Sequence, residues 1–116
     1  FNIVAEAGAV IVSGSQSHVP HYAEFYGNTF LHYGLGNLFF DQYGIAENTD
    51  IGFLDRHIFY DGRYLGVELI PIQFIDKVQP RLMTAEEKAE TLTIMFDTMR
   101  MWWKDENNQP VMPDWK

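Results

Sequence analysis

The fold of this chain is organised by the stretch Ser13-Gly14-Ser15-Gln16-Ser17-His18-Val19, which directly follows the apolar run Ala9-Val10-Ile11-Val12. The apolar run predicts a short buried strand, and the small residues after it predict a turn. A strand that ends in such a turn places the following His at a sheet edge, where an imidazole can bind a metal or act in catalysis. A purely structural His is an equal alternative here, because a single His is weak evidence for a metal site.

A second segment has the same mixture of small and strongly apolar residues, namely Gly34-Leu35-Gly36-Asn37-Leu38-Phe39-Phe40-Asp41-Gln42. Its glycines permit close backbone approach or unusual dihedral angles. We expect Asn37 to orient the His18 loop through hydrogen bonds. The alternative is a tight turn in which the segment satisfies only its own backbone groups.

Composition and charge exclude several classes of protein. With 116 residues the chain is long enough for one domain and too short for two. The net charge of −8 and the lack of any basic run argue against nucleic-acid binding. The absence of cysteine excludes disulfides and cysteine-based zinc sites. No stretch reaches the ~20 apolar residues of a membrane span, and no signal peptide is visible.

The N-terminal part predicts a helix followed by a hairpin. Residues 1–7 form the expected helix, which ends at Gly8. Because the chain opens inside a helix, we expect it to be a piece of a longer polypeptide with any targeting signal upstream. Aromatic-rich runs at residues 22–26 and 29–33 flank Gly27-Asn28, which predicts a hairpin with a two-residue turn.

A second, longer hairpin is expected in the middle of the chain. Residues 53–60 and 63–74 flank Asp61-Gly62, a strong hairpin signal because both turn positions favour positive φ. The second arm is apolar on both faces, which predicts that part of it is covered on both sides. Pro71 predicts interrupted pairing or an edge position, and residues 43–50 predict a loop.

The last third predicts one amphipathic helix. Thr84 is the expected N-cap, and Glu87 three residues later completes a capping box. The apolar stripe of this helix, expected to dock on the sheet, consists of Ala85, Ala89, Leu92, Met95, Phe96, Met99, Trp102 and Trp103. Residues 105–116 are polar with two prolines and predict a tail or crossing segment.

Most of the chain resembles a known family. The blocks that carry the resemblance are Ala7-Gly8-Ala9-Val10-Ile11-Val12-Ser13-Gly14-Ser15-Gln16-Ser17-His18-Val19, Glu24-Phe25-Tyr26-Gly27-Asn28 and Leu31-His32-Tyr33-Gly34-Leu35-Gly36-Asn37-Leu38-Phe39-Phe40-Asp41-Gln42. Their order and spacing resemble the CapA-like family of bacterial capsule-synthesis or poly-γ-glutamate biosynthesis proteins. Later segments resemble one branch of that family: Asp55-Arg56-His57, Tyr60-Asp61-Gly62 and Gln79-Pro80-Arg81.

The resemblance implies a calcineurin-like metallophosphoesterase fold, which is a four-layer α/β/β/α sandwich with two metal ions at the strand ends. Residues 1–116 would then be the C-terminal portion of a single CapA-like domain, with β-hairpins and a C-terminal amphipathic helix. The upstream half, which supplies most of the metal ligands, is absent from this chain. In such a site the two ions hold a water and clamp a phosphoryl group.

The resemblance also implies roles for individual residues. The family's His-x-His ligand pair matches Gln16 and His18, so His18 is expected to be a metal ligand and catalytic group. An amide oxygen is a weaker ligand than imidazole for zinc-like metals, so Gln16 implies that one metal is lost, weakened or exchanged. The metal could be Mn, Mg, Zn or Ca. Residues expected to support the site or contact the substrate are Ser15, His21, Asn37 and Asp41, whereas His32 and His57 are expected to be structural.

Three functions follow from these expectations. The first is an anionic-polymer biosynthesis protein, for capsule or poly-γ-glutamate, with a metallophosphoesterase-like cleft. The second is an active metal-dependent phosphoesterase, a hydrolase, and the third is an unrelated β-rich binding module. The expected partners are the upstream half of the same protein, an anionic polymer or phosphoester, and capsule synthase components. By resemblance the location is extracytoplasmic or at the cell surface, and the isolated chain should expose apolar surface and self-associate.

Overall fold

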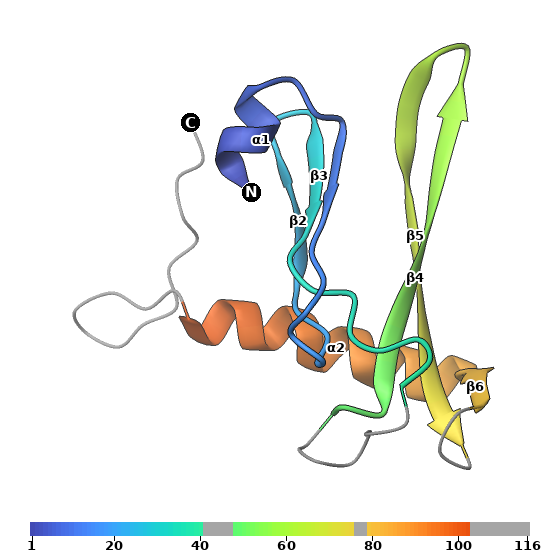
Figure 1. The fold of residues 1–116 in the computed structure, drawn as a ribbon. Helices are drawn as coiled ribbons and strands as arrows, with labels where there is room; N and C mark the ends of the chain where they lie inside the picture. Colours follow the sequence, from blue (N-terminus) through green and yellow to red (C-terminus); the bar gives the residue numbers. More distant parts are fainter. Residues whose placement is uncertain (41–47, 76–78, 103–116) are drawn as a thin grey trace.

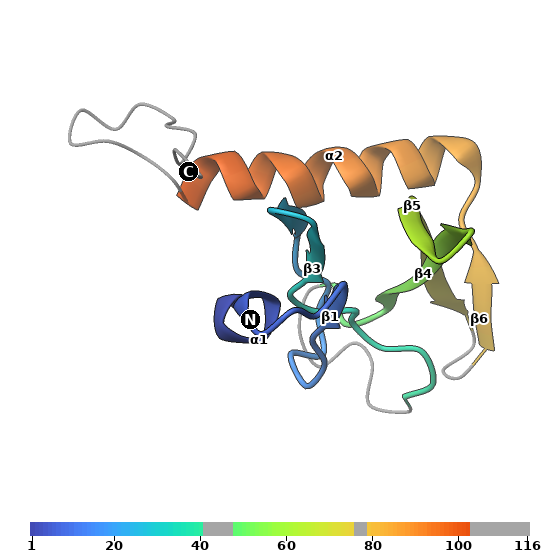
Figure 2. The same ribbon diagram turned by 90° about the horizontal axis from the view of Figure 1, so that it is seen from above.

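The computed structural model describes residues 1–40, 48–75 and 79–102. In chain order the elements are α1 (Asn2–Glu6), β1 (Ile11–Ser13), β2 (Ala23–Tyr26), β3 (Thr29–His32), β4 (Ile51–Tyr60), β5 (Arg63–Ile75), β6 (Gln79–Leu82) and α2 (Ala85–Trp102). The strands form two three-stranded sheets, and α2 runs across the same side of both (Figures 1 and 2). Mixed α/β structure with hairpins and a C-terminal helix is therefore confirmed, and the four-layer sandwich stays a prediction.

Both predicted hairpins are present, with the turns where the sequence placed them. In the first, Tyr26 pairs with Thr29 across Gly27-Asn28. In the second, Tyr60 pairs with Arg63, and the turn residues Asp61 and Gly62 have φ values of 47° and 69°. The second turn thus has the two positive φ angles that an Asp-Gly pair adopts at low cost.

The first sheet has the strand order β1-β3-β2, with β1 parallel to β3. Its central strand β3 is buried along its whole length. The expectation of a buried strand at residues 9–12 is wrong in two respects. The observed strand covers Ile11–Ser13, and it is half-buried or exposed. The physical reason is its position, since β1 forms the edge of the sheet while β3 occupies the centre.

The second sheet has the order β4-β5-β6, and its two halves differ in burial. At the base, Pro71, Ile72 and Phe74 are buried, and β6 pairs with β5 only from Ile72 onward, so Pro71 lies where this pairing stops. The pairing of β5 with β4 is not interrupted there, because Pro71 pairs with Phe53, so of the two expectations for Pro71 the edge position is the one observed, on the side away from β4. Towards the turn the hairpin projects from the body (Figure 1), and the large apolar side chains there are exposed. The prediction that the second arm is covered on both faces therefore holds only at the base of the hairpin.

The sequence did not predict β6, because a four-residue segment containing Pro80 carries no alternating apolar pattern. The two terminal helices agree better with expectation. Helix α1 ends before Gly8, which has a φ of 99° and suits a helix C-terminus. Residues 48–50 of the expected loop form a turn, while residues 43–47 of that loop lie outside the described residues, as do Trp103 and the expected tail at residues 105–116.

Helix α2 begins with the predicted capping box. The backbone N–H of Thr84 donates to Glu87 Oε2 at 2.8 Å, and the backbone N–H of Glu87 donates to Thr84 Oγ1 at 3.3 Å. Arg81 adds two hydrogen bonds of 2.7 Å to the same carboxylate and is the main cause that lowers the pKa of Glu87 to about 2. Of the predicted apolar stripe, Met95 is buried, but Phe96 remains 38% exposed. The stripe is therefore only partly covered by the described residues.

Candidate functional site

The loop between β1 and β2 has an unusual backbone at the two residues that the sequence marked as ligands. Gln16 has a φ of 87° and His18 a φ of 60°, both in the left-handed region that residues other than glycine rarely adopt. Such positions cost on the order of 1–3 kcal/mol and persist only where the surroundings hold them. Strain of this kind clusters at functional sites, so the two angles draw attention to this loop.

The side chain of Asn37 holds this loop in place. Its amide nitrogen donates to the carbonyl oxygen of His18 at 3.1 Å and to that of Thr49 at 2.9 Å. Its amide oxygen lies 3.0 Å from His18 Nδ1. Asn37 is only 7% exposed, so these contacts are shielded from water. The expected hydrogen bonds between Asn37 and the His18 loop are therefore present.

These contacts also determine which nitrogen of His18 is available. Two carbonyl acceptors on one side of Asn37 require its NH₂ group there, so its oxygen must face the imidazole. An amide oxygen only accepts hydrogen bonds, and His18 Nδ1 must therefore carry the proton. In the neutral ring Nε2 then keeps its lone pair, which is the form that binds a metal or accepts a proton.

The surroundings of the His18 ring combine solvent access with an apolar wall. His18 is exposed, and its ring packs against that of Phe40 with centroids 4.5 Å apart. The neighbouring Leu38 and Phe39 are 41% and 72% exposed. The imidazole can thus be reached from solvent on a surface that also carries apolar side chains.

Gly34 and Gly36 allow the segment that contains Asn37 to pack closely against its neighbours. A Cβ atom on Gly34 would lie 2.7 Å from the hydroxyl oxygen of Ser17, which is closer than packed atoms normally come. Gly36 has a φ of 71° and would place a Cβ 2.5 Å from the carbonyl oxygen of Ile51. The small residues that the sequence singled out are needed for contact with the His18 loop and with β4.

A buried His–Asp pair ties this loop to both sheets. His32 Nδ1 lies 2.7 Å from Asp55 Oδ2, and His32 Nε2 lies 3.1 Å from the carbonyl oxygen of His21. The side chains of His32 and Asp55 are 0% and 5% exposed. Both ring nitrogens of His32 therefore face acceptors, one from β4 and one from the loop before β2. The structural interpretation of His32 agrees with this arrangement.

The remaining predicted site residues are only partly brought together. Ser15 and Gln16 are exposed on the same loop as His18. His21 is exposed, and its backbone N–H donates to the carbonyl oxygen of Gly34 at 2.9 Å. Asp41 lies outside the described residues. Within residues 1–40, 48–75 and 79–102, no three His, Cys, Asp or Glu residues form a group that could hold a metal.

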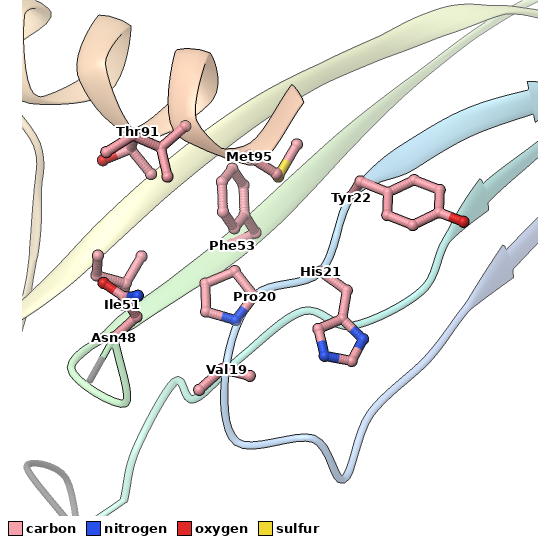
Figure 3. Close-up of a pocket in the computed structure, with 10 residues that line it drawn as sticks. Val19, Pro20, His21, Tyr22, Asn48, Ile51, Phe53, Thr91 and Met95 are labelled. Atoms are coloured by element: carbon pink, nitrogen blue, oxygen red, sulfur yellow. The ribbon is translucent and has the colours of Figure 1, made fainter. Parts of the chain in front are cut away.

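A pocket of about 700 Å³ opens beside this loop (Figure 3). Its walls come from the residues just after His18, from the start of β4 and from α2, and they are mostly apolar. The lining residues are Val19, Pro20, His21, Tyr22, Asn48, Ile51, Phe53, Thr91, Ile94 and Met95. A volume of this size is within the range of small-molecule sites.

Comparison with known proteins gives a family for the segment that contains this loop. Residues 2–42 match the family of bacterial capsule synthesis protein PGA_cap. The match confirms the resemblance to capsule-synthesis proteins, and at family level it supports a role in capsule synthesis. It includes both His18 and Asn37. No curated protein matches the chain, and no helix among the described residues has the length and apolar character needed to cross a membrane.

Sequence reasoning missed two partners of the PGA_cap-like segment. Thr49 supplies the second carbonyl for Asn37, and Asp55 supplies the carboxylate for His32. Both come from later in the chain, 12 and 23 positions away. No local spacing rule connects residues so far apart, and the segment containing Asp55 was predicted as a hairpin arm with no link to His32.

Proposed function

We propose that this chain carries part of a cleft that binds a phosphoester or an anionic polymer in a capsule or poly-γ-glutamate biosynthesis protein, acting outside the cytoplasm or at the cell surface. The observation that carries the proposal is the hydrogen bonding between Asn37 and His18, which leaves Nε2 of an exposed imidazole without a hydrogen-bond partner in the part of the chain that the structure describes. The family match of residues 2–42 supports capsule synthesis as its setting.

Three residues of this chain would have separate roles in the cleft. His18 offers a nitrogen lone pair, and Asn37 keeps the ring in the required tautomer, as partners of metal-binding histidines commonly do. Gln16 sits two residues away on the same exposed loop and carries an amide oxygen suited to a hard cation. His18 and Gln16 therefore fit as part of a divalent metal site, whose further ligands would come from other residues of the full protein. A bound ion would polarise a phosphoryl oxygen and supply an activated water.

Without a metal, the same arrangement can still bind an anion. A protonated His18 can donate from Nε2 to a phosphate or carboxylate oxygen while Nδ1 remains bonded to Asn37. The glutamate side chains of a polymer and the phosphoryl group of an ester present the same kind of oxygen. Anion binding thus needs fewer groups besides His18 than metal-dependent hydrolysis does, and hydrolysis is the second candidate. The family match argues against an unrelated β-rich binding module.

The proposal is tested on the full-length protein by measuring metal content, binding of poly-γ-glutamate and hydrolysis of bis(p-nitrophenyl) phosphate. We compare wild type with His18→Ala and, as control, His57→Gln, whose ring contacts Tyr64 rather than the His18 loop. We expect His18→Ala to weaken polymer binding at least about tenfold, equivalent to one charge-assisted hydrogen bond, and His57→Gln to leave it unchanged. Hydrolysis that needs metal and is lost in His18→Ala would favour the phosphoesterase. Polymer binding and hydrolysis that are both unaffected by His18→Ala would contradict the proposal.

A further inference from the structure

The pocket beside the His18 loop is larger and more apolar than a phosphate or a glutamate side chain requires. Its central residues include Phe53, Ile51 and Met95, and it encloses about 700 Å³. Binding sites of this volume typically take a small organic molecule on apolar walls with a few polar groups. In this pocket the polar groups include Asn48 and Thr91.

The pocket and the proposed anion site share the loop that follows β1. Val19, the residue after His18, lines it, and so does Asn48, the residue before Thr49. Asn37 bonds to the carbonyl oxygens of His18 and Thr49, so it braces both walls at that end. His18 is therefore the chain neighbour of one wall residue, and Asn37 contacts the chain neighbours of two.

We propose that the site takes a phosphate carrying an apolar chain, with the phosphate at His18 and the chain in the pocket between the His18 loop, β4 and α2. This inference rests on the proposed function for the position of the phosphate. The pocket supplies the rest, because its described walls are mostly apolar and include no Lys or Arg, so they favour an alkyl chain over a second anionic group, with His21 as the one imidazole among the described lining residues. Leu38 and Phe39, which precede the Phe40 that packs on His18, add further exposed apolar surface in this segment.

Helix α2 provides a matched pair of variants for the test. Thr91 lines the pocket, while Thr93 is exposed and bonds through its hydroxyl to the backbone of its own helix. Thr91→Asp would place a charge beside the bound chain, and Thr93→Asp would make the same change on the same helix outside the pocket. Figure 3 shows Thr91 on the helix that faces Phe53 and Pro20.

The experiment measures by calorimetry the affinities of ethyl phosphate and n-hexyl phosphate for the full-length protein. Each methylene moved from water into an apolar site tightens binding about fourfold, so the longer chain, with four more methylenes, should bind about 200-fold more tightly. The ratio of the two affinities cancels the contribution of the phosphate. We expect Thr91→Asp to reduce this ratio at least about tenfold and Thr93→Asp to leave it unchanged.

The result separates this inference from the proposed function. A hexyl-to-ethyl ratio near one, or an equal ratio in Thr91→Asp and Thr93→Asp, overturns the apolar-chain inference alone. Ethyl phosphate binding that is unchanged in His18→Ala overturns the phosphate position and with it this inference, whereas the proposed function fails only if polymer binding and hydrolysis are also unaffected by His18→Ala. If Thr91→Asp does not fold, as judged by circular dichroism, Thr91→Asn replaces it, since its amide is also poorly solvated beside a bound alkyl chain.

Discussion

The His18 loop and the outer half of the β4–β5 hairpin show two opposite ways of using side chains. The loop is held by polar contacts from the buried side chains of Asn37 and His32, and it leaves the His18 imidazole exposed. The hairpin is held by its own ladder, and it exposes apolar side chains such as Phe59 and Leu65, which are 54% and 62% exposed. The first pattern fixes the geometry of a chemical group. The second leaves apolar area uncovered, as surfaces that meet a partner do.

The largest effect should come from breaking the buried pair that joins the two sheets. Asp55→Ala leaves the His32 imidazole buried at 0% exposure without its carboxylate, and we expect a loss of about 3–5 kcal/mol in the free energy of unfolding. Urea unfolding measures it. The matched control is Arg56→Ala, which removes an ion pair whose side chains are 68% and 45% exposed, and it should cost at most about 1 kcal/mol. Equal losses for the two variants would show that the buried pair does not hold the sheets together.

The next effect should come from the residue that holds the loop. Asn37→Ala removes a buried amide and leaves the carbonyl oxygens of His18 and Thr49 without that donor. We expect a loss of about 2 kcal/mol in urea unfolding, since each neutral hydrogen bond contributes about 1 kcal/mol. Polymer binding should weaken as well, because His18 loses its tautomer control. Asn28→Ala, in the exposed turn of the first hairpin, is the control and should change neither quantity. An Asn37→Ala variant with unchanged stability and unchanged polymer binding would show that Asn37 neither holds the loop nor positions His18.

On the hairpin the expected effect is on association and hardly on stability. Replacing Phe59 by Ser should change the free energy of unfolding by no more than about 0.5 kcal/mol, because the side chain is 54% exposed. It should lower self-association of the isolated 116-residue chain, measured by sedimentation velocity over a range of concentrations. In wild type we expect a concentration-dependent midpoint in guanidine unfolding. A sharp midpoint that does not depend on concentration would show that the exposed apolar surface needs no partner.

The smallest effect concerns pH and the start of α2. Arg81 and the capping box lower the pKa of Glu87 from 4.5 to about 2. A carboxylate with a lowered pKa stabilises the folded state fully above its ordinary pKa, and this contribution is lost as the pH falls from 4.5 towards 2. Helix content measured by circular dichroism should therefore fall in this window more in wild type than in Glu87→Gln. Identical acid profiles would argue that the carboxylate does not stabilise the helix.

How far the sequence predicts this structure depends on the range of the interactions. Turns and caps are local, so Asp61-Gly62 and the Thr84–Glu87 box could be located from a few adjacent residues. The degree of burial of β1 could not be predicted, because an apolar run does not reveal whether its strand will be central or at an edge. The strand β6 has no apolar pattern of its own and is defined only by pairing with β5.

The candidate site shows the same limit. His18 and Asn37 stood out because small residues surround both, and those glycines are needed for their contact. Thr49 and Asp55 did not stand out as partners, since their roles arise only when a later strand packs beside the loop. Metal binding, catalysis and the identity of the polymer depend on further groups beyond the residues described, and they stay proposals.

The tautomer of the His18 ring is the most direct test of whether Asn37 leaves Nε2 available for a ligand. Long-range nitrogen–proton NMR correlation on the full-length protein, at mildly alkaline pH, distinguishes the two neutral tautomers of each histidine. If Asn37 Oδ1 accepts from His18 Nδ1, the ring is protonated at Nδ1 and bare at Nε2, and Asn37→Ala abolishes this preference. A His18 ring protonated at Nε2 in the wild-type protein would contradict the account.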